Sequence, residues 1–444
     1  MRQTIEELIA RGEMRVVERQ VDPRFELAAV VAASQRESEA ALLFRAIKGS
    51  AVPAASNLYG SYDRLCRLIG APISNEDGNF VRRWSELSGA FEAKPVDPAI
   101  RLADPGDLIE ARLSELPAVT YHEKDAGPYI TAGIVLARHP ESGTANLSFH
   151  RAMQVNDKEL RIRIGESHDL AGLMAAAEAQ DEALEVAMLL GTAPEIFLAA
   201  CASLPPEADE LATAAMIRGK AVPVRHCAHI GLAVPADTEI VIEGRLLPGV
   251  RRPEGPFGEF MGYYVPGGNN HVLEIKGISA RRAPTYHALL CGSPEDMRPL
   301  ETAIAARIYR HLVKAGLPGI IDVSCRPRLL NTVVKIAKQS ADHPREVIMA
   351  AFDAHPDYSK AVVVVDQDID ITDMNEAWWA YLTRGRADTR AFVIEDRPGF
   401  YRDPKGDHKG RLGIDATLPL DRKFEFELKR VPGADTIDLK DYLS

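Results

Sequence analysis

Short helical and extended patterns are mixed in the first part of the chain. Apolar positions spaced three and four apart predict an amphipathic helix over residues 4–11, ended by Gly12. The apolar run 41–44 predicts a short strand, and 56–66 is typical of a loop that leads into a helix. This mixture favours an N-terminal α/β region over residues 1–115.

The pattern changes over residues 116–305, where short apolar or alternating runs are separated by Gly and Pro. Such runs are typical of a β-barrel or a β-sandwich. One Ala- and Leu-rich segment interrupts them and is predicted to be a helix over 170–190, with Asp169 placed to cap its start. Strands are expected over 129–138, 145–153, 160–164, 240–247 and 271–278.

The last third, residues 306–444, predicts an α/β domain. A run of four valines bounded by charged residues, within 360–365, indicates a buried strand. The charged tail, 423–444, is expected to dock elsewhere on the protein or on a partner subunit. Helices are expected around 301–314 and 347–354, and further strands over 320–324 and 331–337.

Composition excludes several classes of protein. The 444 residues carry 53 basic and 64 acidic side chains, a net charge of −11, which argues against a nucleic-acid scaffold. Charges spread through the first 20 residues predict no signal peptide. The most apolar stretch, 184–204, is broken by Glu185, Pro194 and Glu195, so no membrane span is expected. Five cysteines without a CxxC pair favour a reducing compartment, and we expect a cytoplasmic protein.

Common catalytic signatures are missing. The sequence has no HExxH, no GxSxG, no Walker loop and no GxGxxG after a strand. Asp366, Asp368 and Asp370 alternate like metal ligands but lack the Gly and the closing Glu of an EF-hand, so a strand end and loop are expected there. His226 and His229 flank Cys227 without a further Cys pair, which favours a structural pair over a zinc site.

The segment 253–264, PEGPFGEFMGYY, carries two carboxylates in a turned loop. Pro256 with Gly255 and Gly258 excludes a regular helix or a central strand. Glu254 and Glu259 lie beside aromatic residues, and carboxyl groups near apolar rings have raised pKa values and can hold a proton near neutrality. The alternative is a surface turn whose acidic side chains are solvated.

A second polar segment, 146–151, alternates like a strand. Alternation places Asn146, Ser148 and His150 on one face and Leu147, Phe149 and Arg151 on the other. An Asn oxygen is a plausible ligand for a hard cation, and an Arg fork suits a carboxylate. The alternative is a sheet strand with one polar face.

Taken in order along the chain, these segments resemble the UbiD-type decarboxylases, the prenylated-flavin family. The likeness rests on Asn146-x-x-x-x-Arg151, a His some twenty residues on, and the motif at 253–264. The strand from Lys360 and the segment 412–417, LGIDAT, resemble the family's C-terminal motifs. The resemblance implies an α+β fold: an N-terminal α/β region, a central split β-barrel that binds flavin, and a C-terminal α/β domain for oligomerisation.

The resemblance also implies a cofactor site. Asn146, His168 and Glu210 match the ligands of a divalent metal, usually Mn²⁺, that bridges to the phosphate of prenylated FMN. K⁺ accompanies that metal in family members. Each position has a plainer interpretation alone, since His168 precedes a helix and Glu210 lies in an acidic patch. The positions implied to line or hold the cofactor are Thr131, Asn146, Ser148, Phe149, His150, Arg151, Ser167, His168, Glu210 and Lys360.

The implied reaction is the reversible, non-oxidative decarboxylation of an aromatic, heteroaromatic or α,β-unsaturated acid. Loss of CO₂ from an sp² carbon leaves an in-plane anion that no side chain delocalises, so a cofactor is needed as electron sink. Arg151 would grip the substrate carboxylate and Glu254, and Glu259 would supply the replacing proton. Candidates for substrate selection are Met261, His287 and Arg298.

The implied partners are the acid substrate, a flavin prenyltransferase that supplies the cofactor, and further copies of the chain as a homodimer or homohexamer. Two alternatives belong to other classes of protein. A split-barrel reductase that uses ordinary FMN has no use for the set Arg151, Glu254 and Glu259. A non-catalytic cofactor carrier or assembly subunit could dispense with Glu259.

Overall fold

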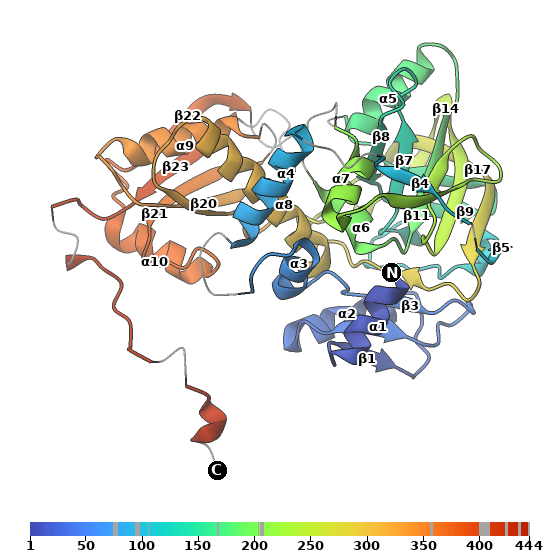
Figure 1. Cartoon of the computed structure of the whole chain (residues 1–444), viewed down its shortest axis with the longest axis horizontal. Coiled ribbons are helices and arrows are strands. Elements are labelled where there is room, and N and C mark those ends of the chain that lie inside the picture. The colour runs from blue at the N-terminus through green and yellow to red at the C-terminus, as the bar shows by residue number, and fades with distance from the viewer. Residues whose placement is uncertain are drawn as a thin grey trace. The chain divides into compact units, whose positions relative to one another are not determined.

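The computed structural model describes residues 1–73, 79–93, 98–104, 106–166, 168–202, 204, 208–355, 358–398, 409–421, 425–433 and 437–442. The chain divides into two compact units, Met1–Ile304 and Ala305–Ser444 (Figure 1). The boundary expected near residue 115 falls inside the first unit, and the division of that unit into two domains stays a prediction.

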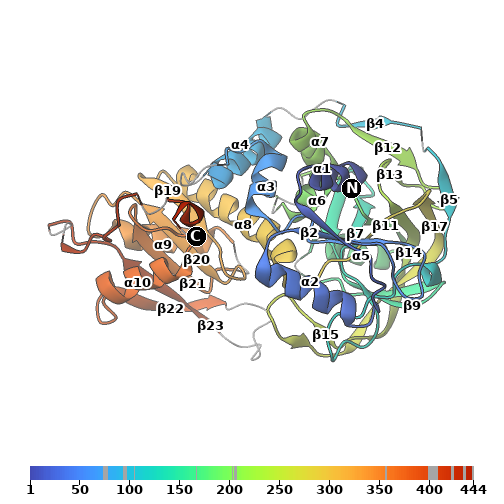
Figure 2. The same cartoon turned by 90° about the horizontal axis from the view of Figure 1, so that it is seen from below.

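A four-stranded sheet organises the start of the first unit. Its order is β1-β2-β3-β18, so a strand from far along the chain, β18 (Tyr286–His287), completes it by pairing in parallel with β3. Figures 1 and 2 show α2 beside this sheet. The remaining elements here are α1 (Arg2–Ala10), β1 (Met14–Val17), α2 (Glu26–Glu37), β2 (Ala41–Phe44), β3 (Ala54–Ser56), α3 (Tyr62–Ile69) and α4 (Asn79–Ala93).

A nine-stranded antiparallel sheet forms the rest of the first unit. Its path is β6-β9-β10-β17-β14-β11-β7-β8, and β5 also pairs with β17. The strands are β5 (Leu108–Glu110), β6 (Tyr129–Ile130), β7 (Ile134–Arg138), β8 (Ala145–Phe149), β9 (Ala152–Asn156), β10 (Glu159–Ile162), β11 (Leu184–Leu190), β14 (Ile240–Glu254) and β17 (Gly268–Arg281).

Helices and short ladders surround this sheet. The helices are α5 (Asp169–Glu178), α6 (Pro194–Cys201) and α7 (Glu210–Arg218), with a 3₁₀ turn at Leu113–Glu115. One small sheet joins β4 (Ile100–Leu102), β12 (Val222–His226) and β13 (Ala233–Pro235), and a hairpin joins β15 (Phe257–Gly258) to β16 (Tyr264–Val265). The mixed α+β architecture is therefore as expected, while a split barrel stays an interpretation of the nine-stranded sheet.

The core of the first unit lies against the long central strands. Alternate residues of neighbouring strands, such as Val186, Met188, Ile240 and Ile242, are fully buried in one apolar cluster. Because successive strand residues face opposite sides, this burial fixes the register of β11 and β14. The same register fixes which strand ends reach the polar sites described below.

The second unit is a five-stranded mixed sheet with helices on it. Its order is β19-β20-β21-β23-β22, with β20, β21 and β23 parallel. The valine run from Val362 to Val365 is buried in the middle of this sheet, as expected for a parallel strand. The elements are α8 (Pro294–Lys314, which crosses the boundary), β19 (Ile320–Ser324), β20 (Asn331–Ile336), α9 (His343–Asp353), β21 (Ala361–Asp366), α10 (Met374–Arg384), β22 (Ala391–Pro398), β23 (Lys409–Ala416) and a 3₁₀ turn at Leu439–Asp441.

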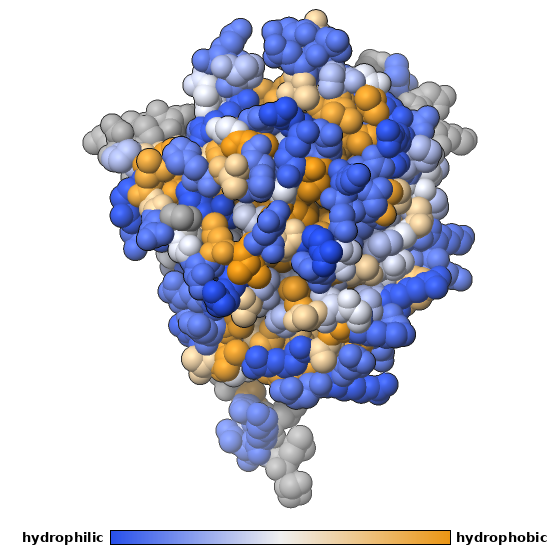
Figure 3. Space-filling model, turned by 90° about the vertical axis from the view of Figure 1, so that its right-hand side faces the viewer, coloured by the Kyte–Doolittle hydropathy of each residue, from blue (hydrophilic) through white to orange (hydrophobic). Residues whose placement is uncertain are grey.

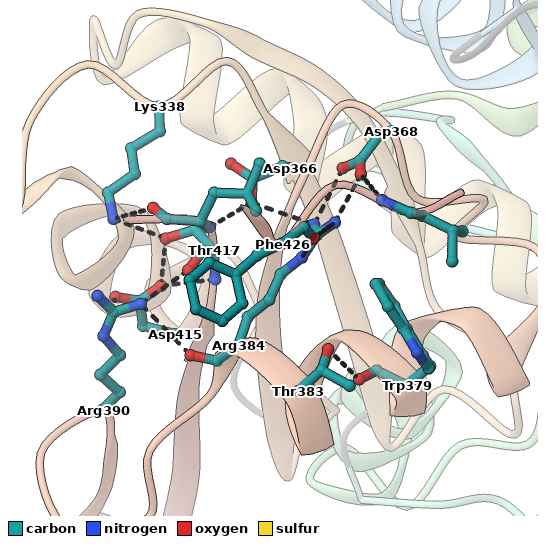
Figure 4. A network of polar contacts seen from close by, with 12 residues as sticks. Lys338, Asp366, Asp368, Trp379, Thr383, Arg384, Arg390, Asp415, Thr417 and Phe426 are labelled. Carbon is teal, nitrogen blue, oxygen red and sulfur yellow. Dashed lines mark hydrogen bonds and ion pairs between the residues drawn. The ribbon is translucent and has the colours of Figure 1, made fainter. Parts of the chain in front are cut away.

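The aspartates after β21 hold an arginine (Figure 4). The fully buried Arg384 donates to Asp368 Oδ1 at 2.9 Å and to Asp366 Oδ2 at 3.3 Å. It also donates to the carbonyl of Phe426, and Asp368 accepts from the backbone N–H of Leu428. The aspartates are thus a strand end and loop that dock the first part of the tail onto its own unit.

One predicted element is wrong, and two predicted strands are each divided: 129–138 forms β6 and β7, and 145–153 forms β8 and the start of β9. Helix α5 ends at Glu178, and Leu184–Leu190 is the strand β11 between β7 and β14 rather than a continuation of the helix. A fully buried strand has a continuous apolar run, which periodicity alone does not distinguish from a helix. Asp169 is also not the cap: His168 occupies the N-cap position and Asp169 begins the helix.

Polar and charged residues cover much of the face shown in Figure 3, with apolar residues visible between them. Among the residues that the structure describes, no helix combines the length and the apolar character that crossing a membrane requires.

Glycine at position 244 lies at an irregularity in the β14–β17 ladder, and an added methyl group has no room there. A Cβ would lie 2.4 Å from the carbonyl oxygen of Glu274. We predict that Gly244→Ala lowers the free energy of unfolding by about 1–3 kcal/mol in urea denaturation, as overpacking does. The control, Gly172→Ala in α5, meets nothing within 4 Å and is expected to stabilise by roughly 0.5–1 kcal/mol. An unchanged stability for Gly244→Ala would contradict the packing of this ladder.

Candidate active site

Strand β8 carries a polar face, as its alternation predicts. The Ser148 hydroxyl lies 3.1 Å from Asn146 Oδ1 and 2.8 Å from His150 Nε2. His150 Nδ1 lies 3.2 Å from the carbonyl of Arg163, which only accepts, so Nδ1 carries the proton and Nε2 accepts from Ser148. Burial, reinforced by His168, lowers the pKa of His150 to about 3 and keeps the ring neutral. The single Ser148 proton then points to His150, which leaves Asn146 Oδ1 able to serve a ligand.

Two helices begin beside this strand. The side chains of Asp209 and Glu210, at the start of α7, accept hydrogen bonds from the backbone N–H groups of Ala145 and Leu147, on either side of Asn146. The His168 ring, at the start of α5, lies 5.0 Å from the His150 ring between centroids. Glu210 is therefore linked to the residue next to Asn146, and His168 lies beside the residue that follows this strand.

The charge of Glu210 is poorly compensated in this cluster. Burial, reinforced by the nearby Asp169 and Asp209, raises the pKa of Glu210 to about 8. Carboxylate, amide and imidazole donors together suit a divalent cation that prefers oxygen and nitrogen, and two helix N-termini favour an anion such as phosphate. Within the described residues no three His, Cys, Asp or Glu side chains group around a metal position, and this trio depends instead on the amide of Asn146.

A second cluster lies at the end of β14, where Arg151 is placed between two carboxylates. Its Nε and one terminal nitrogen donate to Glu254 at 3.0 and 3.2 Å, and its other terminal nitrogen lies 4.0 Å from Glu259 Oε1. Glu254 and Glu259 are 1% and 7% exposed. The guanidinium also lies 4.6 Å from the centre of the Phe257 ring. The solvated-turn alternative is thereby excluded, because both carboxylates are buried with the arginine.

The loop that carries these carboxylates is fixed by the segment before β6. Asp125 accepts from the backbone N–H of Gly258 at 2.8 Å, and Ala126 donates to the carbonyl of Pro256. Gly258 has no space for a side chain, since a Cβ would lie 2.5 Å from the His122 ring. Gly255 has φ +86°, a conformation that favours glycine. The glycines of the motif thus allow the close packing that buries Glu254 and Glu259.

The other positions expected to hold the cofactor divide into three groups. Thr131 is buried, and its hydroxyl donates to the carbonyl of Leu289 at 2.6 Å. Phe149 is half-buried, and its ring packs at 4.9 Å against Phe197. Ser167 lies outside the described residues. Lys360 belongs to the second unit, where its carbonyl accepts from Leu412.

The three candidates for substrate selection lie in different settings. Met261 is half-buried in the turn between β15 and β16. His287 is buried, and its Nε2 lies 2.9 Å from Glu295, which also accepts from the backbone N–H groups of Asn57 and Leu58. Arg298 pairs with Glu39 and donates to the carbonyl of Gly60. His287 and Arg298 are therefore both engaged in holding the loop after β3.

Sequence reasoning missed three residues that position the carboxylates: Tyr129, Asn270 and Asp125. The Tyr129 hydroxyl donates to Glu254 at 2.9 Å and the Asn270 amide donates at 2.8 Å. Tyr129 lies 125 residues before Glu254 in the sequence, and Asn270 lies on a different strand, β17. Only the register of the strands therefore reveals them. Asp125 lies in a polar run, 122–126, whose spacing matches no motif, so the sequence alone does not single it out.

Family models match the chain in three consecutive segments. They describe the N-terminal, Rift-related and C-terminal domains of 3-octaprenyl-4-hydroxybenzoate carboxy-lyase, UbiD, and match residues 5–84, 105–294 and 300–416. The chain belongs to the UbiD family. It is therefore a UbiD-family decarboxylase, and the enzymes of this family are carboxy-lyases.

Characterised relatives resemble it over nearly their whole length. The anhydromevalonate phosphate decarboxylase of Methanosarcina mazei is 33% identical over 437 residues, which cover 97% of this chain and 99% of the relative. The UbiD-class enzyme HmfF from Pelotomaculum thermopropionicum, solved with FMN, is 34% identical, with a TM-score of 0.91 over 100% of this chain and 99% of that one. An evolved dimeric form of HmfF, solved with prFMN, is 33% identical, with a TM-score of 0.87 over the same shares.

For this UbiD-family chain we predict that the buried Glu210 destabilises the metal-free protein at high pH. The pKa is 4.5 ordinarily and about 8 when folded, so the folded state binds the extra proton between those values. Stability is therefore complete below pH ~4.5 and falls as pH rises towards ~8. Glu210→Gln removes this loss, and in chelator-treated protein its Tm is expected to exceed that of the parent by several degrees at pH 8–9 but not at pH 4.5–5.

The control is Glu178→Gln, because Glu178 is paired with Arg251 and has its pKa lowered by that arginine. A Glu210→Gln protein that gains nothing at pH 8–9 would show that the carboxylate is not under electrostatic stress.

Proposed function

We propose that this UbiD-family enzyme binds prenylated FMN and removes CO₂ reversibly, without net oxidation, from an aromatic, heteroaromatic or α,β-unsaturated acid. The observation that carries the proposal is the buried arrangement in which Arg151 is held by Glu254 and faces Glu259. The flavins named in the HmfF structures, FMN and prFMN, support the same kind of cofactor here.

Asn146, His168 and Glu210 are the residues that would hold a divalent ion, with Mn²⁺ as the first candidate, against the flavin phosphate. The donor set suits such an ion, and Glu210 is buried beside two further acidic residues, which a cation would balance. K⁺ and a role for Lys360 and Ser167 complete the proposal by family resemblance. When bound, the prenylated flavin supplies the electron sink that decarboxylation at an sp² carbon requires.

The residues of the chain divide the remaining work. Arg151 binds the substrate carboxylate through the terminal nitrogen that is not committed to Glu254. Glu254 holds that guanidinium in place by two hydrogen bonds. Glu259, which is buried and across Arg151 from Glu254, delivers the proton that replaces CO₂. Phe257 lies under the guanidinium and helps to exclude water.

The substrate proposal is narrowed by one relative and by two side chains. Anhydromevalonate phosphate is by its name a dehydrated acid that carries a phosphate, so an unsaturated aliphatic acid is the first class to test. His287 and Arg298, which would suit a second carboxylate, are bound to Glu295 and Glu39 instead. A panel should compare unsaturated aliphatic acids, with and without a phosphate, with aromatic and heteroaromatic acids, scored by CO₂ release.

Partners and location follow as proposals from the family. The chain would receive its cofactor from a flavin prenyltransferase and would act as a cytoplasmic homodimer or homohexamer. A dimeric form described for HmfF supports self-association. The exposed Trp378 and Leu382 on α10 are compatible with a covered surface in the second unit.

The first test of the proton donor is Glu259→Gln, which keeps the size of the side chain and removes the acid. Turnover is expected to fall by at least about 10²-fold, the range of a lost general acid. The absorbance spectrum of bound flavin is expected to be unchanged, because Glu259 is not part of the proposed cofactor cluster. The control is Glu274→Gln, a half-buried residue of β17 that is paired with Lys276, which should retain activity. Full activity of Glu259→Gln would remove Glu259 from the reaction.

The second test concerns the cofactor cluster. Asn146→Ala and Glu210→Ala, each made in cells that co-express a flavin prenyltransferase, are expected to yield protein depleted of both divalent metal and flavin, because each variant loses one donor of the ion. Metal content by mass spectrometry and flavin by absorbance measure this. Glu178→Ala, at the end of α5 and paired with Arg251, is the control. Normal metal content in both variants would show that the ligands lie elsewhere.

A further inference from the structure

Glu254 receives an unusually complete set of hydrogen bonds for a carboxylate. Arg151 and the Tyr129 hydroxyl donate to Oε1 at 3.0 and 2.9 Å, and Arg151 and the Asn270 amide donate to Oε2 at 3.2 and 2.8 Å. A carboxylate offers about four lone-pair positions, so these four donors account for all of them. A carboxylate in this state has no lone-pair position left for a further donor.

The register of two ladders explains how the donors meet. Across β6 and β9, Tyr129 pairs with Met153, which places Tyr129 diagonally opposite Arg151. Across β14 and β17, Arg252 pairs with Asn270, which places Asn270 diagonally opposite Glu254. Diagonal neighbours on one face of a ladder lie within reach of long side chains. Each ladder thus contributes one pair, and the two pairs meet at the Glu254 carboxylate.

The direction of the Tyr129 hydroxyl is fixed by a second contact. Its oxygen accepts from the backbone N–H of Gly255 at 3.1 Å, so its proton is directed to Glu254. The ring is 0% exposed and packs at 4.5 Å against Phe257, the ring that lies under Arg151. Burial and the charge of Glu254 raise the pKa of Tyr129, which keeps this hydroxyl a donor.

We propose that Tyr129 and Asn270 are positioning residues that hold the Glu254 carboxylate in place and thereby set the direction of the Arg151 edge that faces Glu259 and the substrate. The inference rests on the proposed function and adds to it a division between the two carboxylates. Glu254 is the fixed counter-charge, and Glu259 is the carboxyl group that exchanges protons.

Loss of a donor to Glu254 is expected to change the position of Arg151, because Arg151 binds the same two carboxylate oxygens that Tyr129 and Asn270 bind. The charged or titratable groups around Glu254 include Arg151, Glu259, Tyr129 and Asp125, together with Arg251 and Arg252 on β14 and His271 on β17. Asp125 is already bound to the backbone of His122 and Gly258. Removing the Tyr129 hydroxyl takes away one of the donors that stabilise the negative charge opposite Arg151, so activity should be lost at a higher pH on the acid side.

The kinetic test uses the flavin-loaded enzyme with its best substrate. Tyr129→Phe keeps the ring and is expected to lower kcat about 10-fold, the effect of one charge-assisted hydrogen bond, with flavin content unchanged. The acid limb of the kcat/KM profile should move to higher pH. Asn270→Asp replaces a donor by a second carboxylate and is expected to be worse. The matched control, Asn269→Asp on the exposed opposite face of β17, should keep the parent profile.

A loss of kcat without any movement of the acid limb would indicate a merely structural role and overturn the proposal. So would an Asn270→Asp profile that matches that of Asn269→Asp.

The second arm needs no turnover. Tm values of Tyr129→Phe, Glu254→Gln and the double variant form a cycle, and the drop for the double variant is expected to be smaller than the sum of the single drops. Additive drops would show that Tyr129 does not act through Glu254. A coupled cycle in a protein that turns over none of the acids would leave the network intact and refute the proposed function instead.

Discussion

The candidate site depends on a buried arginine, Arg151, whose positive charge requires a buried counter-charge. An unpaired guanidinium is costly to bury, and truncating one partner of a buried ion pair leaves the other charge uncompensated. Glu254 meets this need by two hydrogen bonds, and its remaining positions are filled by Tyr129 and Asn270. The strand register, the glycines of the loop and the anchor at Asp125 are all conditions for this burial.

Much of the site could be predicted because its residues lie in short, locally readable segments. The polar face of β8 follows from strict alternation, and the short contacts of Ser148 with Asn146 and His150 confirm it. The turned loop after Glu254 follows from its prolines and glycines. Neither prediction required knowledge of which strands pair, because each rests on contacts within a few residues.

The features that could not be predicted depend on pairing between distant strands. Leu184–Leu190 has the composition of a helix, and only its place between β7 and β14 makes it a strand. Tyr129 and Asn270 gain their roles from registers across β6–β9 and β14–β17, which no local pattern records. The engagement of His287 by Glu295 likewise depends on a loop more than two hundred residues earlier in the chain.

The pairing of β18, the strand that contains His287, has a consequence for how the protein folds during synthesis. Because β18 completes the first sheet by pairing with β3, the backbone of residues 54–55 gains its hydrogen bonds to that strand only after residues 286–287 have been synthesised. Contacts between residues so far apart in the sequence slow folding, because the intervening chain loses entropy on closing before the contact can stabilise the fold. During synthesis the leading segment therefore emerges with one strand edge open, a state that invites mispairing with other chains. A chaperone that shelters that edge until the later strand arrives would raise the yield of native protein.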